Sequence, residues 1–386
     1  MPTEPANSLT RIGRPIWLGR LARASLVAGA ATCLVGCASP AGPVFTPLAT
    51  PLLFPPPPDE PRIAYVGAIG TDADLKAGKS PLDSLGEAIF GASSINSMLS
   101  PFAICTVGSK LYVCDTNAQV VHVFDLETRA YRQLRPTIDG KGEFNQPVGI
   151  TSDPDGRLWV SDSVAGRIHF FDPRGTYLGA IGEGTVQRPT GIRYDAANGR
   201  LFVADTGLHQ VLVLSPDGTL LARVGERGSQ LGQFNFPTNV ALDSAGRLYV
   251  SDTLNFRVQV FDSDLKPLRQ IGRQGDMPGY FSQPKGIALD SEDHLYVVDS
   301  HFEAVQVFDS EGRLLMTFGD EGSGPGQFWL PAGITIDLND RIWIADSYNR
   351  RVQVFDYLRP AQRGPVDTPV DEVAPQPTPS NLETRP

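Results

Sequence analysis

The chain has 386 residues, of which 41% are hydrophobic and 9% aromatic, so it is long enough to bury a sizeable core. Its 33 prolines and 39 glycines are many for a helical protein and favour a chain of short strands and turns. The formal net charge is −10, and removal of residues 1–36, which carry four arginines and one glutamate, would take it to −13. So acidic a chain repels nucleic-acid phosphates, which argues against nucleic acid as a partner.

The first 36 residues have the order of a secretory signal peptide. Four arginines precede the uncharged stretch Ala24–Gly36, which is too short for the roughly 20 apolar residues of a membrane-spanning helix. The stretch ends in Leu34-Val35-Gly36-Cys37, and small residues ahead of a cysteine resemble the lipobox of bacterial lipoproteins. That resemblance implies cleavage before Cys37 and lipidation of Cys37; the alternative is an ordinary cleaved signal. No aspartate follows the cysteine, so we expect a lipid anchor in the bacterial cell envelope, in the outer membrane.

Two proline-rich segments flank the folded part. Residues 37–61 contain the run Pro55–Pro58 and few charges, which predicts a semi-rigid, lipidated tether. Residues 358–386 are rich in proline, threonine and acidic residues, which predicts a disordered tail. The folded domain is therefore expected over residues 62–357.

This domain consists of repeats. Each repeat has a short strand that ends in aspartate, and the spacings between successive aspartates are 47, 43, 47, 47 and 47 residues. A first strand opened by proline precedes it, a third strand such as Val258–Asp262 follows, and a fourth strand ends in glycine. Four short strands in a unit of about 45 residues are typical of a β-propeller blade. The aspartates are Asp115, Asp162, Asp205, Asp252, Asp299 and Asp346.

The end of the repeats indicates how the ring closes. The sixth repeat stops after its third strand at Asp356. Its missing fourth strand is found near the N-terminus, where Tyr65–Gly70 matches the fourth strand Tyr177–Gly182 in five of six positions. A strand from the N-terminus would pair the otherwise exposed edge of the last blade. The sequence therefore predicts an all-β, six-bladed propeller closed by an N-terminal strand.

Two repeats carry a recognisable family pattern. Asp252-Thr-Leu-Asn-Phe-Arg257 and Asp346-Ser-Tyr-Asn-Arg-Arg351, each followed by a Val-Gln-Val-Phe-Asp strand, resemble the NHL repeat. The resemblance covers roughly residues 62–357 and implies the propeller fold. It does not imply an activity, because propellers host many unrelated functions.

The aspartate ring allows two interpretations. Six carboxylates on one face resemble a cation site. Each aspartate, however, is followed directly by serine or threonine, and in several repeats by asparagine or arginine a few residues later, which indicates local hydrogen bonds that fix the turn. We favour the structural interpretation.

Departures from the repeat are better candidates for binding, since packing does not explain them. His301 and Glu303 in the fifth blade and His209 in the third lie in the loops after the aspartates. Asn239 stands where four other blades have glycine, and Lys285 lies beside the same channel opening. Arg188 lies beside that opening as well.

The lipid anchor, the long tether, a lid-like insertion at residues 71–100 and the lack of a recognisable catalytic set lead us to expect a binding or scaffold module for a protein, peptide or glycan of the envelope, with no cofactor. The alternative is a metal-dependent propeller enzyme of the lactonase or peptide-amidating-lyase type, in which His209, Asn239, His301 and Glu303 would hold a divalent cation. The chain has no G-x-S-x-G, H-E-x-x-H or Walker motif.

Two features stay open at this point. Residues 71–100 form a long insertion in which Ser80-Pro81-Leu82-Asp83 resembles a helix start and Gly91 a stop, so we expect a short helix. It would either pack over the channel mouth or serve as a lid or docking element. Cys105 and Cys114 flank one predicted turn and form either a disulfide or two buried thiols.

Overall fold

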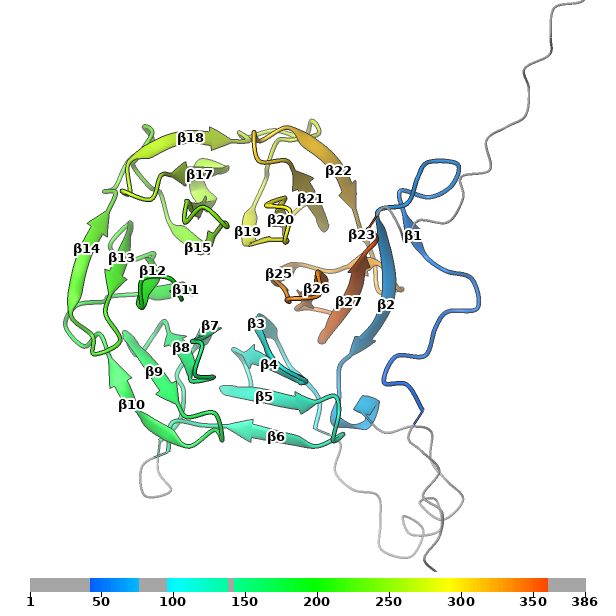
Figure 1. Cartoon of the computed structure of the whole chain (residues 1–386), viewed down its shortest axis with the longest axis horizontal. Coiled ribbons are helices and arrows are strands. Elements are labelled where there is room, and N and C mark those ends of the chain that lie inside the picture. The colour runs from blue at the N-terminus through cyan, green and yellow to red at the C-terminus, as the bar shows by residue number, and fades with distance from the viewer. Residues whose placement is uncertain (1–41, 76–95, 138–141, 360–386) are drawn as a thin grey trace, which may run out of the picture. The chain divides into compact units, whose positions relative to one another are not determined.

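In the computed structural model, which describes residues 42–75, 96–137 and 142–359, the repeats form six antiparallel sheets arranged as the blades of a ring (Figure 1). This confirms the predicted six-bladed propeller. Blade I comprises β3 (Pro101–Val107), β4 (Lys110–Asp115), β5 (Val120–Asp125) and β6 (Tyr131–Leu134). Blade II comprises β7 (Pro147–Ser152), β8 (Leu158–Asp162), β9 (Arg167–Phe171) and β10 (Tyr177–Ile181). Blade III comprises β11 (Pro189–Asp195), β12 (Arg200–Asp205), β13 (Gln210–Leu214) and β14 (Leu220–Val224).

The other three blades repeat this order. Blade IV comprises β15 (Pro237–Leu242), β16 (Leu248–Asp252), β17 (Arg257–Phe261) and β18 (Pro267–Ile271). Blade V comprises β19 (Pro284–Leu289), β20 (Leu295–Asp299), β21 (Ala304–Phe308) and β22 (Leu314–Phe318). Blade VI comprises β25 (Pro331–Ile336), β26 (Arg341–Asp346), β27 (Arg351–Tyr357), β2 (Ile63–Ile69) and β1 (Leu53–Phe54). The loop before β25 holds the short parallel pair β23 (Asp320–Glu321) and β24 (Gln327–Phe328).

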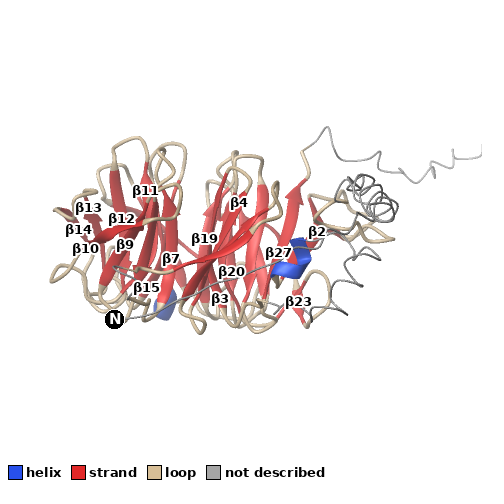
Figure 2. Cartoon of the chain, turned by 90° about the horizontal axis from the view of Figure 1, so that it is seen from below, coloured by secondary structure: helices blue, strands red, loops and turns tan. Residues whose placement is uncertain are grey.

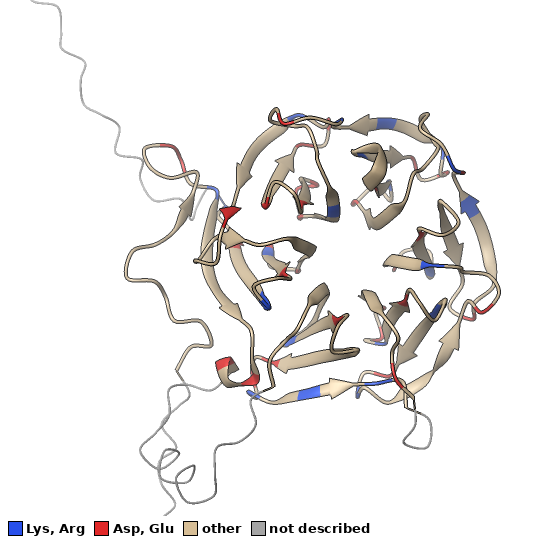
Figure 3. Cartoon of the chain, turned by 180° about the vertical axis from the view of Figure 1, so that it is seen from behind, with Lys and Arg blue, Asp and Glu red and all other residues tan. Residues whose placement is uncertain are grey.

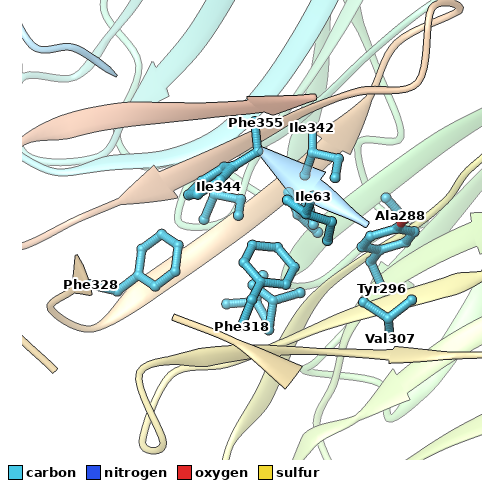
Figure 4. Packing of buried hydrophobic residues seen from close by; sticks show 12 residues of the cluster. Ile63, Ala288, Tyr296, Val307, Phe318, Phe328, Ile342, Ile344 and Phe355 are labelled. Atoms are coloured by element: carbon cyan, nitrogen blue, oxygen red, sulfur yellow. The ribbon is translucent and has the colours of Figure 1, made fainter. Parts of the chain in front are cut away.

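The hydrophobic core lies between blades. Among the described residues, six clusters of buried side chains each join two neighbouring blades. In the cluster between blades V and VI, Ile63 and Phe355 pack with Tyr296 and Phe318 (Figure 4). Strands in the middle of a blade, such as β16 and β17, are buried along their whole length because both of their faces are covered. Each fully buried large apolar side chain stabilises the fold by roughly 1.5–3 kcal/mol.

The N-terminal strand closes the ring, as predicted. β2 pairs antiparallel with β27, from Ile63 opposite Tyr357 to Ile69 opposite Val352. Ile63 and Ile69 are both fully buried, so closure also completes the cores on either side of blade VI.

Part of the segment expected as a tether packs against the propeller. Residues from Pro43 onward belong to the same compact unit as the blades, and β1 adds a fifth strand to blade VI by pairing with β2. Phe54 packs against Phe318 and Phe355, at centroid distances of 5.7 and 6.3 Å. Phe45 packs over Gly67, where a Cβ atom would lie 2.6 Å from Phe45 Cδ1. At least the second half of residues 37–61 is therefore part of the propeller.

The insertion after β2 begins with a 3₁₀ turn, η1 (Asp72–Leu75), and Thr71 bridges to Ser97. The helix expected at residues 80–91 lies outside the described residues. The described part of the chain contains no helix with the length and apolar character needed to cross a membrane.

Loops project from two opposite faces of the ring (Figure 2). The aspartate face carries the loops after each second strand, such as the 3₁₀ turn η2 (Thr253–Asn255), and the loops that lead to the next blade. The hairpin face carries the turns between first and second strands and between third and fourth strands. Basic and acidic residues are interspersed around the ring (Figure 3).

Candidate functional site

The six ring aspartates are turn-fixing residues. All six side chains are fully buried. Asp162 accepts hydrogen bonds from the backbone N–H groups of Asn145 and Gln146, at 2.6 and 2.9 Å, and from that of Ala165 at 3.0 Å. Its carboxylate thus ties the loop after β8 to the segment that enters β7. The other five aspartates each accept at least one backbone N–H from the corresponding entering segment of their own blade. This confirms the structural interpretation, since the carboxylates face the protein.

Blades IV and VI contain the complete NHL arrangement around this aspartate. In blade IV, Asp252 Oδ2 accepts from Arg257 Nε, Gln259 Nε2 and Asn255 Nδ2, at 2.8–2.9 Å. Arg257 Nη2 also donates to the carbonyl oxygens of Gln230 and Gln233 in the glycine-rich loop. Arg351 and Gln353 make the equivalent contacts with Asp346 in blade VI.

Histidine replaces this glutamine in blades I and II. His122 Nε2 lies 3.2 Å from Asp115 Oδ2, and its Nδ1 lies 2.7 Å from the Tyr131 hydroxyl. His169 Nδ1 lies 3.2 Å from the Tyr177 hydroxyl, while its buried Nε2 has no hydrogen-bond partner. Burial lowers the pKa of His169, against the opposing charge of Asp162. Both histidines are packing residues.

The serine or threonine after the aspartate joins neighbouring blades. Thr253 Oγ1 donates to the carbonyl oxygen of Pro284 at 2.7 Å, and Ser347 Oγ donates to that of Pro101 at 2.6 Å. Ser300 Oγ donates to the carbonyl oxygen of Pro331 in the same way, so blades IV, V and VI each hold the proline that opens the next first strand. In blades I and III the hydroxyls of Thr116 and Thr206 instead donate to carbonyl oxygens of their own blade.

Two of the candidate residues make similar contacts. His209 and Glu303 occupy equivalent loop positions, both with φ of 54°. His209 Nδ1 accepts from the backbone N–H of Phe236, and Glu303 Oε1 accepts from that of Leu330, so each reaches the next blade. Both are largely buried, and burial raises the pKa of Glu303.

The remaining candidates occupy other positions on the loops and at the channel. His301 and Arg188 are exposed on the loops of blades V and III. Lys285 is half-buried at the start of β19, where burial lowers its pKa against the opposing charge of Asp299. Asn239 lines the central cavity, and its Oδ1 accepts from the N–H of Val240 at 2.8 Å.

The structure therefore does not bring His209, Asn239, His301 and Glu303 together. Over residues 42–75, 96–137 and 142–359, no three His, Cys, Asp or Glu side chains form a group that could hold a metal ion. Cys37, the predicted lipidation site, lies outside the described residues. Cys105 and Cys114 are both buried and free, so the alternative of two buried thiols is confirmed.

Sequence reasoning missed an aromatic pair on the aspartate face. Trp329 and Tyr348 are 50% and 60% exposed, and their ring centroids lie 5.5 Å apart. The Tyr348 N–H donates to the Trp329 carbonyl at 3.2 Å, and the Trp329 N–H donates to Asp346 Oδ1 at 2.8 Å. The alignment of repeats contains the signal, because blades II to V place polar residues where blade VI has tryptophan: Asn145, Gln187, Asn235 and Ser282.

Comparisons with known proteins identify the repeat and the fold. A family model described as an SMP-30/gluconolactonase/LRE-like region matches residues 102–190, and one described as a 6-bladed beta-propeller matches residues 289–363. The NHL repeat model matches residues 186–214 and 234–261.

Solved structures agree with this. A streptogramin B lyase is 13% identical over 67% of this chain and 94% of its own, with a TM-score of 0.51. An auxiliary nutrient binding protein from Bacteroides thetaiotaomicron is 14% identical over 67% of this chain and 69% of its own, with a TM-score of 0.53. Such low identities show the fold alone. The chain is a six-bladed β-propeller built from NHL repeats.

Proposed function

We propose that this protein is a binding module of the bacterial cell envelope that holds a protein or peptide partner on its aspartate face. The observation that carries the proposal is the exposed, mutually contacting pair of Trp329 and Tyr348. Large aromatic side chains that stay half-exposed on a folded protein mark interaction surfaces, and tryptophan and tyrosine dominate the binding energy of many interfaces.

The surroundings of the pair favour a protein or peptide over a glycan. On the same face Leu99, Val164 and Leu254 are 46%, 64% and 44% exposed. The hydrogen bond from Ser347 to Pro101 holds the Tyr348 loop beside the segment of blade I that carries Leu99. An aromatic pair with Leu99 in the adjoining blade, on a face that exposes further aliphatic residues in blades II and IV, matches the apolar centre of a protein interface. A glycan site would need polar side chains around the rings.

The backbone of the pair is fixed before any partner arrives. Trp329 is held by Asp346, which is fully buried and also bound by Arg351 and Gln353. A surface that is ordered in advance loses less conformational entropy when it binds. The NHL arrangement thus positions the aromatic pair.

We also propose that Cys37 is lipidated and anchors the propeller to the membrane, as the lipobox resemblance implies. The test is the variant Cys37→Ser, expressed in a bacterium that processes lipoproteins. We expect wild type in the membrane fraction and the variant in the soluble fraction. Equal membrane association of both would contradict the anchor.

The alternative of a metal-dependent enzyme has one supporting observation, the SMP-30/gluconolactonase/LRE-like match over residues 102–190. Two of its four proposed ligands, His209 and Glu303, instead hold backbone N–H groups of the next blade. Metal content of the purified chain, together with melting curves with and without chelator, tests it. One divalent ion per chain and a melting temperature lowered by chelator would favour the enzyme.

The binding proposal is tested by photo-crosslinking in the native envelope. A photoreactive phenylalanine analogue replaces Tyr348, and as a control it replaces Leu178 on the outer strand β10, which is 50% exposed. We expect one discrete protein adduct from position 348, none from position 178, and loss of the adduct when Trp329→Ala is added. Adducts from both positions, from neither, within the chain itself or with glycan alone would contradict a protein partner on this face.

A further inference from the structure

A central cavity of about 400 Å³ opens toward the hairpin face, opposite the aromatic pair. Its wall runs from Asn239 and the glycines of the first strands to the hairpin tips, such as Gly108 and Leu338. The loop-face residues Arg188, Lys285 and His301 are not part of this wall. A concave site of this size accommodates a small organic molecule.

The first strands line the cavity with two successive rings of residues. The first ring is aliphatic in all six blades: Ile104, Ile150, Ile192, Val240, Ile287 and Ile334. The second ring is small in five blades: Cys105, Thr151, Ala241, Ala288 and Thr335. Blade III breaks this second ring with Arg193, whose side chain is exposed. Packing does not require an arginine there, since five equivalent positions are filled by small residues.

Arg193 is directed into the cavity and is free to bind. Burial raises the pKa of Cys105, and the positive charge of Arg193 opposes this shift from two blades away. Among the described residues the side chain of Arg193 has no hydrogen bond or ion pair, and Arg193 is the one lysine or arginine in the wall. The hydroxyls of Thr106, Ser152 and Thr335 belong to the same wall.

The two carboxylates of the wall are already engaged. Asp153 Oδ1 accepts from the N–H groups of its own hairpin, and Asp153 Oδ2 accepts from Trp159 Nε1 at 3.4 Å. Asp337 Oδ1 likewise accepts from the N–H groups of its own hairpin, and Asp337 Oδ2 accepts from Trp343 Nε1 at 3.2 Å. Neither neutralises Arg193, but both disfavour a ligand with several negative charges.

We propose that this cavity binds a small organic monocarboxylate, with its carboxylate on Arg193 and its apolar part against the aliphatic ring. The planar guanidinium can donate two parallel hydrogen bonds to one carboxylate, which gives orientation as well as affinity. The site is independent of the partner surface on the aspartate face, so the failure of either proposal leaves the other intact.

The test is a titration of the full chain with para-fluorobenzoate, followed by fluorine NMR. The neutral analogue para-fluorobenzamide and competition by inorganic phosphate define the chemistry. Arg193→Thr installs the residue that blades II and VI carry at this position, and Arg193→Lys keeps the charge without the planar fork. Arg174→Thr is the matched control, because Arg174 is exposed in the β9–β10 hairpin on the same face and outside the cavity.

We expect para-fluorobenzoate to bind wild type and Arg174→Thr equally, at least tenfold more weakly to Arg193→Thr, and with intermediate affinity to Arg193→Lys. Wild type should bind para-fluorobenzamide at least tenfold more weakly than para-fluorobenzoate. Absence of carboxylate binding, equal binding to Arg193→Thr, or displacement by phosphate more effective than by benzoate would overturn the proposal. Melting curves of both Arg193 variants establish that they are folded.

Discussion

Because of the NHL arrangement, we expect replacement of Asp252 to lower the free energy of unfolding more than replacement of Asp299 does. Asp252 and Asp299 are both fully buried, but Asp252 faces the side chain of Arg257, which is 5% exposed. Blade V has Ala304 in place of that arginine, and within the described part of the chain the hydrogen bonds to Asp299 all come from backbone N–H groups. Asp252→Asn therefore leaves a buried cation without its counter-charge, whereas Asp299→Asn weakens hydrogen bonds whose donors are neutral backbone N–H groups.

The expected magnitudes follow from this difference. Breaking a buried ion pair by neutralising one partner costs about 3 kcal/mol or more. Loss of one or two hydrogen bonds to a buried carboxylate costs about 1–2 kcal/mol. The free energy of unfolding should thus fall by about 1–2 kcal/mol more in Asp252→Asn than in Asp299→Asn.

Equilibrium urea unfolding of both variants at neutral pH, followed by tryptophan fluorescence, measures the difference. Asp155→Asn is the surface control, since the side chain of Asp155 is 77% exposed, and it should change stability by less than about 0.5 kcal/mol. In Arg257→Ala, where the cation is gone, a further Asp252→Asn should cost less than it does in wild type. Equal losses at Asp252 and Asp299 would refute this account of the NHL motif.

Three further predictions concern the ring and its histidines. Ile69→Ala in the closing strand should lower the unfolding free energy by about 3 kcal/mol, because Ile69 is fully buried between two blades; a change below about 1 kcal/mol in urea unfolding would contradict its role. Gly333→Ala should destabilise by about 2 kcal/mol or more, since its Cβ would overlap the carbonyl oxygen of Phe102; an unchanged melting temperature would show that the blades can move apart. Burial lowers the pKa of His169 below its usual 6.5, so the unfolded chain takes up the proton first and stability falls as the pH drops below that value. His169→Gln, the residue of blades IV to VI, should lessen this loss between about pH 7 and 5, and an unchanged slope of melting temperature against pH would contradict it.

The fold could be predicted because its determinants are periodic. The strands that end in aspartate recur at nearly constant spacing, and the closing strand Tyr65–Gly70 is close to a copy of Tyr177–Gly182. The packing of Phe45 and Phe54 could not be predicted in this way. Both lie in a proline-rich segment that is not part of any repeat. The space for Phe45 exists only because Gly67 faces it in the folded blade.

The candidate site was predictable only in part. The hydrogen-bonding residues after each aspartate indicated its structural role, and the structure agrees. The departures His209 and Glu303 looked like ligands, but their positive φ turns them toward the next blade, which sequence does not reveal. Trp329 and Arg193 are departures of the same kind. Both stand out in the aligned repeats, but neither tryptophan nor arginine is a metal ligand, so a search for metal ligands does not find them.

The central claim is that the aspartate face binds a partner through Trp329 and Tyr348. The most direct measurement is the affinity of the purified partner, identified by crosslinking, for three proteins: wild type, Trp329→Ala, and the control Leu178→Ala on the outer strand β10. Truncation of a tryptophan at the centre of an interface costs at least about 2 kcal/mol, or a factor of about 30 in Kd. We predict that loss for Trp329→Ala and no change for Leu178→Ala; equal affinity for all three proteins would contradict the claim.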